Sequence, residues 1–153
     1  MIQRVQSIWL FLAALTLFLL LIVPILSNHA TTGDLSLYVG GLYQKANNAA
    51  QQLESYIALF GGTILLALIC LANIFLFKNR TLQKRVIVLS IFLIIVLTGA
   101  IGAVASKTPA LMTGVSSVQA GAGLPVLAMI FCALAFRGIR KDEQLIRSAD
   151  RLR

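Results

Sequence analysis

Residues 86 to 104 read VIVLSIFLIIVLTGAIGAV, a run without a single acidic, basic or histidine side chain. At a helical rise of about 1.5 Å per residue, a run of this length matches the hydrocarbon core of a bilayer, which is about 30 Å thick. The run lacks the alternation with a period of two that a strand of a membrane barrel requires. The stretch therefore predicts a membrane-spanning helix.

Three further stretches share this composition, at residues 8–26, 56–77 and 118–136. They belong to a chain of 153 residues of which 59% are hydrophobic and 12% are charged. Soluble domains carry about 25% charged residues, so the composition excludes an ordinary water-soluble protein. We expect an all-α membrane protein whose single domain is an antiparallel bundle of four transmembrane helices.

The first stretch follows a basic start and so has the layout of a secretory signal peptide. Its apolar run is longer than the usual ~7 to 15 residues. The nearest cleavage region, PILSNHA at 24–30, places Asn28 where a small residue is required. We therefore expect the stretch to remain as a membrane anchor.

Lysine and arginine are distributed unevenly between the two sides of this predicted bundle. The loops at 27–55 and 105–117 contain one each, whereas the other eleven lie in the N-terminus, the 78–85 loop and the 137–153 tail. Basic residues near spans are retained in the cytoplasm, which predicts that both termini are inside and both weakly charged loops are outside. The net charge of +8 then indicates a surface that meets anionic lipid headgroups and no nucleic-acid partner. The residues expected to form this basic collar are Lys78, Arg80, Lys84, Arg85, Arg137, Arg140 and Lys141.

The tail at 137–153 is amphipathic when it is placed on a helix. Its basic residues fall on one face, and Asp142 is the exception within the apolar face. The tail either continues the fourth span as one helix or bends at Gly138 to lie along the membrane. It serves either as a basic anchor that fixes orientation or as a helix that docks on a partner. The candidate docking residues are Leu145, Ile146, Ala149 and Leu152.

The outer loop at 27–55 is the longest segment outside the predicted spans. Its apolar residues alternate with polar ones in DLSLYVGGLYQ (34–44), and Gly40-Gly41 provides a two-residue turn, so a small hairpin is expected there. The following KANNAAQQLES (45–55) has the composition of a polar helix that leads into the second span.

Small residues and one amide indicate how the spans pack. Pairs such as Ala58 with Gly62 and Gly99 with Ala103 follow the small-xxx-small spacing, which predicts contact between the second and third spans or, alternatively, a homo-oligomer contact. Asn73 lies near the cytoplasmic end of the second span, and we expect it to form an interhelical hydrogen bond rather than a binding site.

Residues that carry chemistry are scarce in this sequence. The predicted spans contain no ionisable acid or base, which proton pumps and transporters usually require. His29 is the sole histidine, and Cys70 with Cys132 lie deep in apolar stretches, where they are expected to pack as small apolar residues. We therefore predict no enzymatic activity, no cofactor and no metal site.

The two ends of the chain carry a family resemblance. The opening MIQRVQSIWLFLAA (1–14) and the ending IRKDEQLIRSADRLR (139–153), with four predicted spans between them, resemble a bacterial family of small inner-membrane proteins, domain-of-unknown-function family four-two-nine-three. The resemblance covers the whole chain and implies four helices in the inner membrane. It implies no activity, so no functional residue can be transferred.

These patterns favour a non-catalytic integral protein of the bacterial inner membrane, acting as a structural or accessory subunit that associates with another membrane protein. The alternative is a small transporter or lipid-binding membrane protein. That alternative requires a polar cavity between the spans, which the sequence does not indicate.

Overall fold

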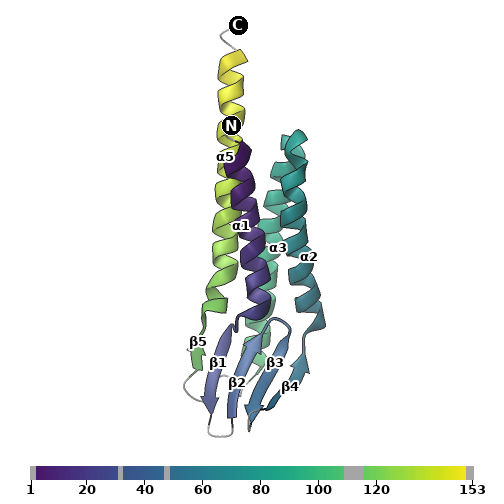
Figure 1. Ribbon diagram of the computed structural model, residues 1–153, viewed down its shortest axis with the longest axis vertical. Coiled ribbons are helices and arrows are strands. Elements are labelled where there is room, and N and C mark those ends of the chain that lie inside the picture. The colour runs from purple at the N-terminus through teal and green to yellow at the C-terminus, as the bar shows by residue number, and fades with distance from the viewer. Residues whose placement is uncertain (1–2, 31–32, 47–48, 109–115, 151–153) are drawn as a thin grey trace.

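The computed structural model describes residues 3–30, 33–46, 49–108 and 116–150. Four long helices, α1 (Gln3–Ile22), α2 (Ile57–Phe75), α3 (Arg80–Lys107) and α5 (Leu124–Asp150), form an antiparallel bundle above a five-stranded sheet (Figure 1). Each helix is long and apolar enough to cross a membrane. The structure therefore confirms the prediction of four helices that could span a membrane. The expectation of an all-α protein is wrong, because the chain also forms a sheet.

The sheet is antiparallel with the strand order β4-β3-β2-β1-β5. The expected hairpin is present, but its turn is at Val39 and Gly40, and Gly41 already pairs with Tyr38. It is one part of a larger structure whose strands are β1 (Leu26–Ala30), β2 (Gly33–Tyr38), β3 (Gly41–Ala46), β4 (Ala49–Ser55) and β5 (Ser116–Val118).

The polar helix expected within 45–55 does not form, because the described residues of this segment belong to strands: 45–46 end β3 and 49–55 form β4. A helix as short as this is marginal in water unless it packs on something. As a strand, β4 satisfies its main-chain groups by pairing with β3, in a register that matches Gly41 with Ser55. The pairing requires glycine at position 41, where a Cβ would stand 2.4 Å from the main-chain oxygen of Glu54.

The two faces of the sheet differ in polarity because its side chains alternate along each strand. Leu35, Leu37 and Leu42 form a small apolar cluster against Val104 and Ala105 near the end of α3. The side chains that alternate with these leucines along β2 and β3 lie on the other face, and they include Ser36, Tyr38 and Tyr43. The sheet is therefore attached to the bundle through one apolar face, while the second face carries hydroxyl groups.

The sheet joins the helices where α1 ends. The main-chain amide of Ile25 donates to Leu37 O at 2.8 Å, and that of Gly121 donates to Pro24 O at 3.2 Å. A Cβ at position 121 would stand 2.4 Å from the same Pro24 oxygen, so glycine is required at this contact. Ser27 and Ser117 add a hydroxyl–hydroxyl bond of 2.8 Å between β1 and β5.

The helix ends differ from the predicted limits for identifiable reasons. Proline cannot continue the hydrogen bonding of a helix, and α1 ends at Ile22 just before Pro24, so residues 23–26 do not belong to the span. The third helix is longer than the 86–104 stretch because its polar and basic ends are helical too. The fourth helix begins at Leu124 rather than at 118, after β5 and a short 3-10 helix, η2 (Ala120–Gly123).

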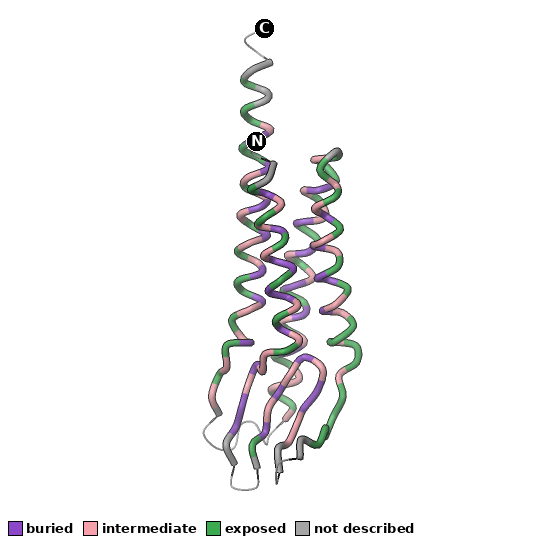
Figure 2. The backbone as a smooth tube through the Cα atoms, viewed as in Figure 1, coloured by how far each residue is buried: buried purple, intermediate pink, exposed green. Residues whose placement is uncertain are grey.

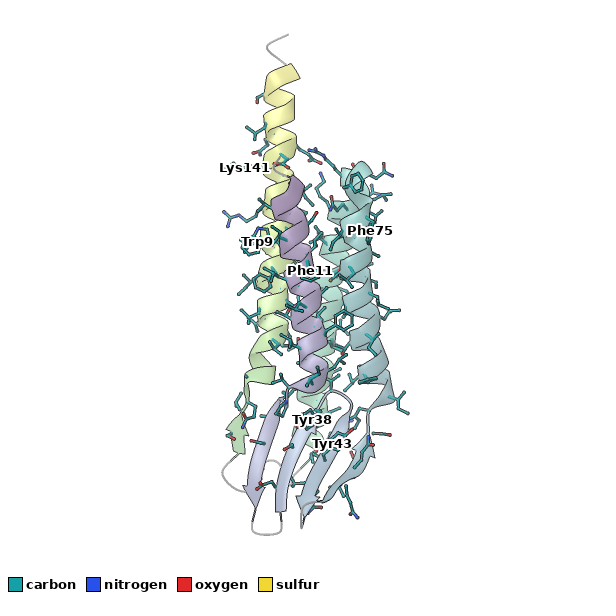
Figure 3. The ribbon with its side chains drawn as sticks, viewed as in Figure 1. Trp9, Phe11, Tyr38, Tyr43, Phe75 and Lys141 are labelled. Carbon is teal, nitrogen blue, oxygen red and sulfur yellow. The ribbon has the colours of Figure 1, made fainter. Side chains whose placement is uncertain are left out.

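The helix α1 packs against α2 and α5, and α3 closes the bundle by packing against both of those helices. The inner faces are buried and the outer faces exposed along the length of the bundle (Figure 2). Large apolar side chains such as Phe11 and Phe75 lie on the outer surface (Figure 3), as expected for helices that face lipid. The fully buried residues of α1 are Leu10, Ala13, Ala14, Leu17 and Leu20.

The small residues do not mediate the contact between α2 and α3. A Cβ at Gly62, Gly99 or Gly102 would meet nothing within 4 Å, so these positions face away from neighbouring helices. The two helices are in contact, and larger residues such as Leu66 of α2 and Ile94 of α3 are buried in the same apolar core. The predicted contact is present, but the small-xxx-small explanation of it is wrong.

Candidate functional site

Both ends of the described chain lie at the same end of the bundle, opposite the sheet (Figure 1). This end contains the starts of α1 and α3 together with the last turns of α5. It also contains most of the basic residues, and we call it the basic end. The side chains of Lys78, Ile146, Arg147 and Ala149 and the whole of Leu152 fall outside the described residues.

The helix α5 runs without interruption from Leu124 through Gly138 to Asp150. Of the two alternatives for the tail, the structure therefore has a continuous helix and no bend at Gly138. The last turns of α5 project beyond the ends of the other three helices (Figure 1). Within them, Gln144, Leu145 and Ser148 are exposed, and Leu145 is 50% exposed.

Asp142 is buried although it interrupts the apolar face of the tail. The side-chain amide of Gln6, itself buried in α1, donates a hydrogen bond to the carboxylate of Asp142. The two helices approach closely here because Gly138 has no side chain, and a Cβ at that position would stand 3.1 Å from Gln6 Cγ. The acidic residue therefore belongs to the contact between α1 and α5.

The collar residues occupy different environments. Arg85, Arg137 and Lys141 are exposed, whereas Arg80 is half-buried. The guanidinium of Arg140 lies 5.8 Å from the centre of the Phe136 ring, one turn earlier on α5, within the range of a cation–π contact.

One collar residue links two helices. The ammonium of Lys84 on α3 lies 2.7 Å from the carboxylate of Glu143 on α5, and both side chains are 25% exposed. Partial burial reduces screening by solvent, so this ion pair is expected to contribute more to stability than a fully exposed pair would. It fastens the start of the projecting segment to α3.

Asn73 lies where α2 turns into α3 through a 3-10 helix, η1 (Leu76–Lys78). Its side-chain amide donates to the main-chain oxygen of Gln83 at 3.4 Å, and the Gln83 amide donates back to the main-chain oxygen of Asn73 at the same distance. These two long bonds bridge the turn between the helices. Asn73 is thus placed in a contact between α2 and α3.

The two cysteines lie inside the bundle. Cys70 on α2 and Cys132 on α5 are both buried. Within the described parts of the chain, no group of three or more histidine, cysteine, aspartate or glutamate side chains could hold a metal ion.

A hollow lies at the sheet end, between the polar face of the sheet and the adjacent ends of α1 and α2. Its volume is about 370 Å³. Tyr38 and Tyr43 meet there edge to face with their ring centres 5.4 Å apart (Figure 3). The hollow is lined by Leu21, Ile22, Asp34, Ser36, Tyr38, Gly40, Tyr43 and Phe60.

Where β4 leads into α2, the Tyr56 hydroxyl donates a hydrogen bond to the Glu54 carboxylate. This bond, with a smaller contribution from burial, raises the pKa of Tyr56 above its ordinary value.

Sequence reasoning missed Gln6 and the polar face of the sheet. The alternation of Leu35 and Leu37 with Ser36 and Tyr38 carried the signal for that face, because residues two apart on a strand share a side. No local sequence pattern distinguished Gln6, because its partner Asp142 lies 136 positions away.

Comparison with curated proteins finds no match to this chain. A family model, in contrast, matches residues 2–152, which is nearly the whole sequence. The model is described as Domain of unknown function (DUF4293), and the protein belongs to this family.

Proposed function

We propose that the protein is a non-catalytic accessory subunit of the bacterial inner membrane that associates with another membrane protein through the projecting end of α5. In this proposal both termini are cytoplasmic and the sheet is external. The observation that carries it is the continuation of α5 beyond the other three helices (Figure 1).

The physical argument concerns the stability of an isolated helical segment. Most helical stability in proteins comes from packing of an apolar face, and a few turns alone are marginal in water. Beyond Glu143 the described side chains of α5 are exposed, yet the helix continues to Asp150 with Leu145 half exposed. A partner groove that accepts Leu145 and residues one and two turns from it would supply the missing packing.

The Lys84–Glu143 pair supports the same proposal. It holds the beginning of the projecting segment against α3, so the segment leaves the bundle in a fixed direction. A pre-oriented helix loses less conformational freedom on binding than a flexible tail. This arrangement favours a docking helix over a tail whose only role is to supply positive charge.

The test is co-purification from native membranes in a mild detergent, with a photo-crosslinker at position 145 to capture the partner. We expect one stoichiometric partner, which is lost when Leu145, Ile146, Ala149 and Leu152 are all replaced by serine. The matched control is Gln144→Ala with Ser148→Ala, which changes the same turns but leaves the apolar stripe intact. Equal recovery of the crosslinked partner with the serine variant and the control would refute the proposal.

A further inference from the structure

A groove of about 440 Å³ lies between α3 and α5 at the basic end. Its size is within the range of sites that hold small molecules or parts of lipids. On the α3 side its walls come from four residues at three- and four-residue spacing, which places them on one face of that helix. The lining residues are Thr81, Lys84, Arg85 and Val88 of α3 with Phe136 and Arg140 of α5.

The groove changes from polar to apolar along the helix axis. Thr81 is in the first turn of α3, and Val88 lies seven residues further into the bundle, a rise of about 10 Å. On α5, Phe136 lies one turn deeper than Arg140. The hydroxyl and the cationic groups are thus nearest the basic end, and the two apolar side chains lie toward the middle of the helices.

The charge of the lining residues favours an anion. Three are cationic and none is acidic. Glu143 offsets part of the positive charge by pairing with Lys84, which leaves Arg85 and Arg140 as the main sources of positive potential. Arginine suits a phosphate group because its planar fork can donate two parallel hydrogen bonds.

We propose that this groove is a binding site for one anionic phospholipid. Arg85 and Arg140 hold the headgroup phosphate from opposite walls, and the Thr81 hydroxyl donates to it. Val88 and Phe136 contact the upper part of an acyl chain. The polar-to-apolar order of the groove matches the order of groups in a phospholipid that enters from the surrounding bilayer.

Such a site differs from a general attraction between basic residues and a negative membrane. In a diffuse collar each lysine or arginine near the surface contributes to a similar extent, whatever direction it faces. In a discrete site the two groove arginines matter more than other cations at the same height. Arg137 and Lys141 provide the comparison, because they lie on the same turns of α5 and are exposed, but do not line the groove.

The experiment measures lipid binding to the purified full-length protein by native mass spectrometry in a non-ionic detergent, with phosphatidylglycerol as the probe and phosphatidylcholine as the neutral-headgroup control. We expect one phosphatidylglycerol to bind with preference over phosphatidylcholine. Arg85→Gln with Arg140→Gln should weaken this binding roughly 10- to 30-fold. Arg137→Gln with Lys141→Gln removes the same charge and should weaken it less than about threefold.

Equal losses in the two double variants, or no loss in either, would overturn the proposal. Effective competition by millimolar inorganic phosphate would also overturn it, because the site would then recognise a soluble anion rather than a lipid. Arg85→Lys with Arg140→Lys keeps the charge and serves as the folding control. Its phosphatidylglycerol affinity should lie between those of the native protein and the glutamine variant, and a fall to the level of the glutamine variant despite native folding would show that the arginine forks, rather than charge alone, hold the phosphate.

Discussion

Gln6 and Asp142 are joined by a hydrogen bond across the contact between α1 and α5, next to the Lys84–Glu143 pair that holds α5 to α3. The donor and the acceptor are both buried, so the bond is shielded from water. Gly138 lies one turn before Asp142 and allows the Gln6 side chain to cross α5. This arrangement fixes where the packed part of α5 ends and its projecting part begins.

The two members of this pair should be energetically coupled. Gln6→Ala leaves a buried carboxylate without this donor and should be the more damaging single change, by about 1.5 to 3 kcal/mol, whereas Asp142→Ala leaves only a neutral amide. In a double-mutant cycle, measured by unfolding in detergent micelles, we expect a coupling energy of about 1 to 2 kcal/mol. Additive effects of the two alanine substitutions would show that the bond does not contribute.

Gly138→Ala should destabilise the protein when position 6 holds glutamine and stabilise it when position 6 holds alanine. In the native background the new methyl group meets Gln6 Cγ at 3.1 Å, and Gln6 cannot easily move because it is bonded to Asp142. We expect a loss of about 0.5 to 1 kcal/mol. In a Gln6→Ala background the same change should stabilise by about 0.5 to 1 kcal/mol, because alanine favours a helix over glycine. The same sign in both backgrounds would argue against the close approach of α1 and α5 at this point.

Asn73 and Gln83, unlike Gln6 and Asp142, should not be energetically coupled. Each side chain bonds to the main-chain oxygen of the other residue, so replacing one side chain leaves the second bond in place. Because both bonds are long, Asn73→Ala and Gln83→Ala should each cost only about 0.5 to 1 kcal/mol. The double variant should cost the sum to within about 0.5 kcal/mol in the same unfolding assay. A coupling energy above about 1 kcal/mol would mean that the two side chains interact directly.

Composition was sufficient to predict the helices but not their ends. Hydropathy identifies the apolar part of α3, whereas the turns around Lys84 and Lys107 are helical without being apolar. At α1 the opposite error arose, because Ile25 and Leu26 are apolar but follow Pro24, and β1 already begins at Leu26. Local apolarity predicts which stretch could cross a membrane, and it predicts the ends of a helix only where the apolar stretch and the helix have the same limits.

The sheet was largely hidden from sequence reasoning because its pairings are distant. Ser27 in β1 pairs with Ser117 in β5, ninety positions away, and neither strand is apolar enough to stand out. Only β2 showed the alternation typical of a strand, and it led to the one hairpin that was predicted. Asp142 was also misjudged because of a distant partner. It interrupted the predicted apolar face of the tail, and the residue that binds it, Gln6, lies at the other end of the chain.

Gly41→Ala should separate β4 from β3. A Cβ there would lie 2.4 Å from a main-chain oxygen of Glu54, which cannot move without breaking the pairing. We expect a loss of about 2 kcal/mol or more and fast amide hydrogen exchange throughout β4. Gly40→Ala is the matched control, because its Cβ would lie 3.3 Å from the Phe60 ring, which can turn aside. Equal protection of β4 in the two variants would contradict the predicted requirement for glycine at position 41.

The orientation in the membrane is the remaining prediction, and it is tested by topology reporters. The N-terminus, the 78–85 loop and the 137–153 tail carry eleven of the thirteen lysine and arginine residues of the sequence, and such an imbalance predicts that these segments stay in the cytoplasm. Alkaline phosphatase, which is active only outside the cytoplasm, should be active when fused after position 45 or 110 and inactive when fused after position 82 or 153. A fluorescent protein that matures only in the cytoplasm should give the reverse pattern at the same four positions. An external position 153 would place the projecting end of α5 and the groove on the outer side, where neither a cytoplasmic partner nor the anionic inner leaflet could reach them.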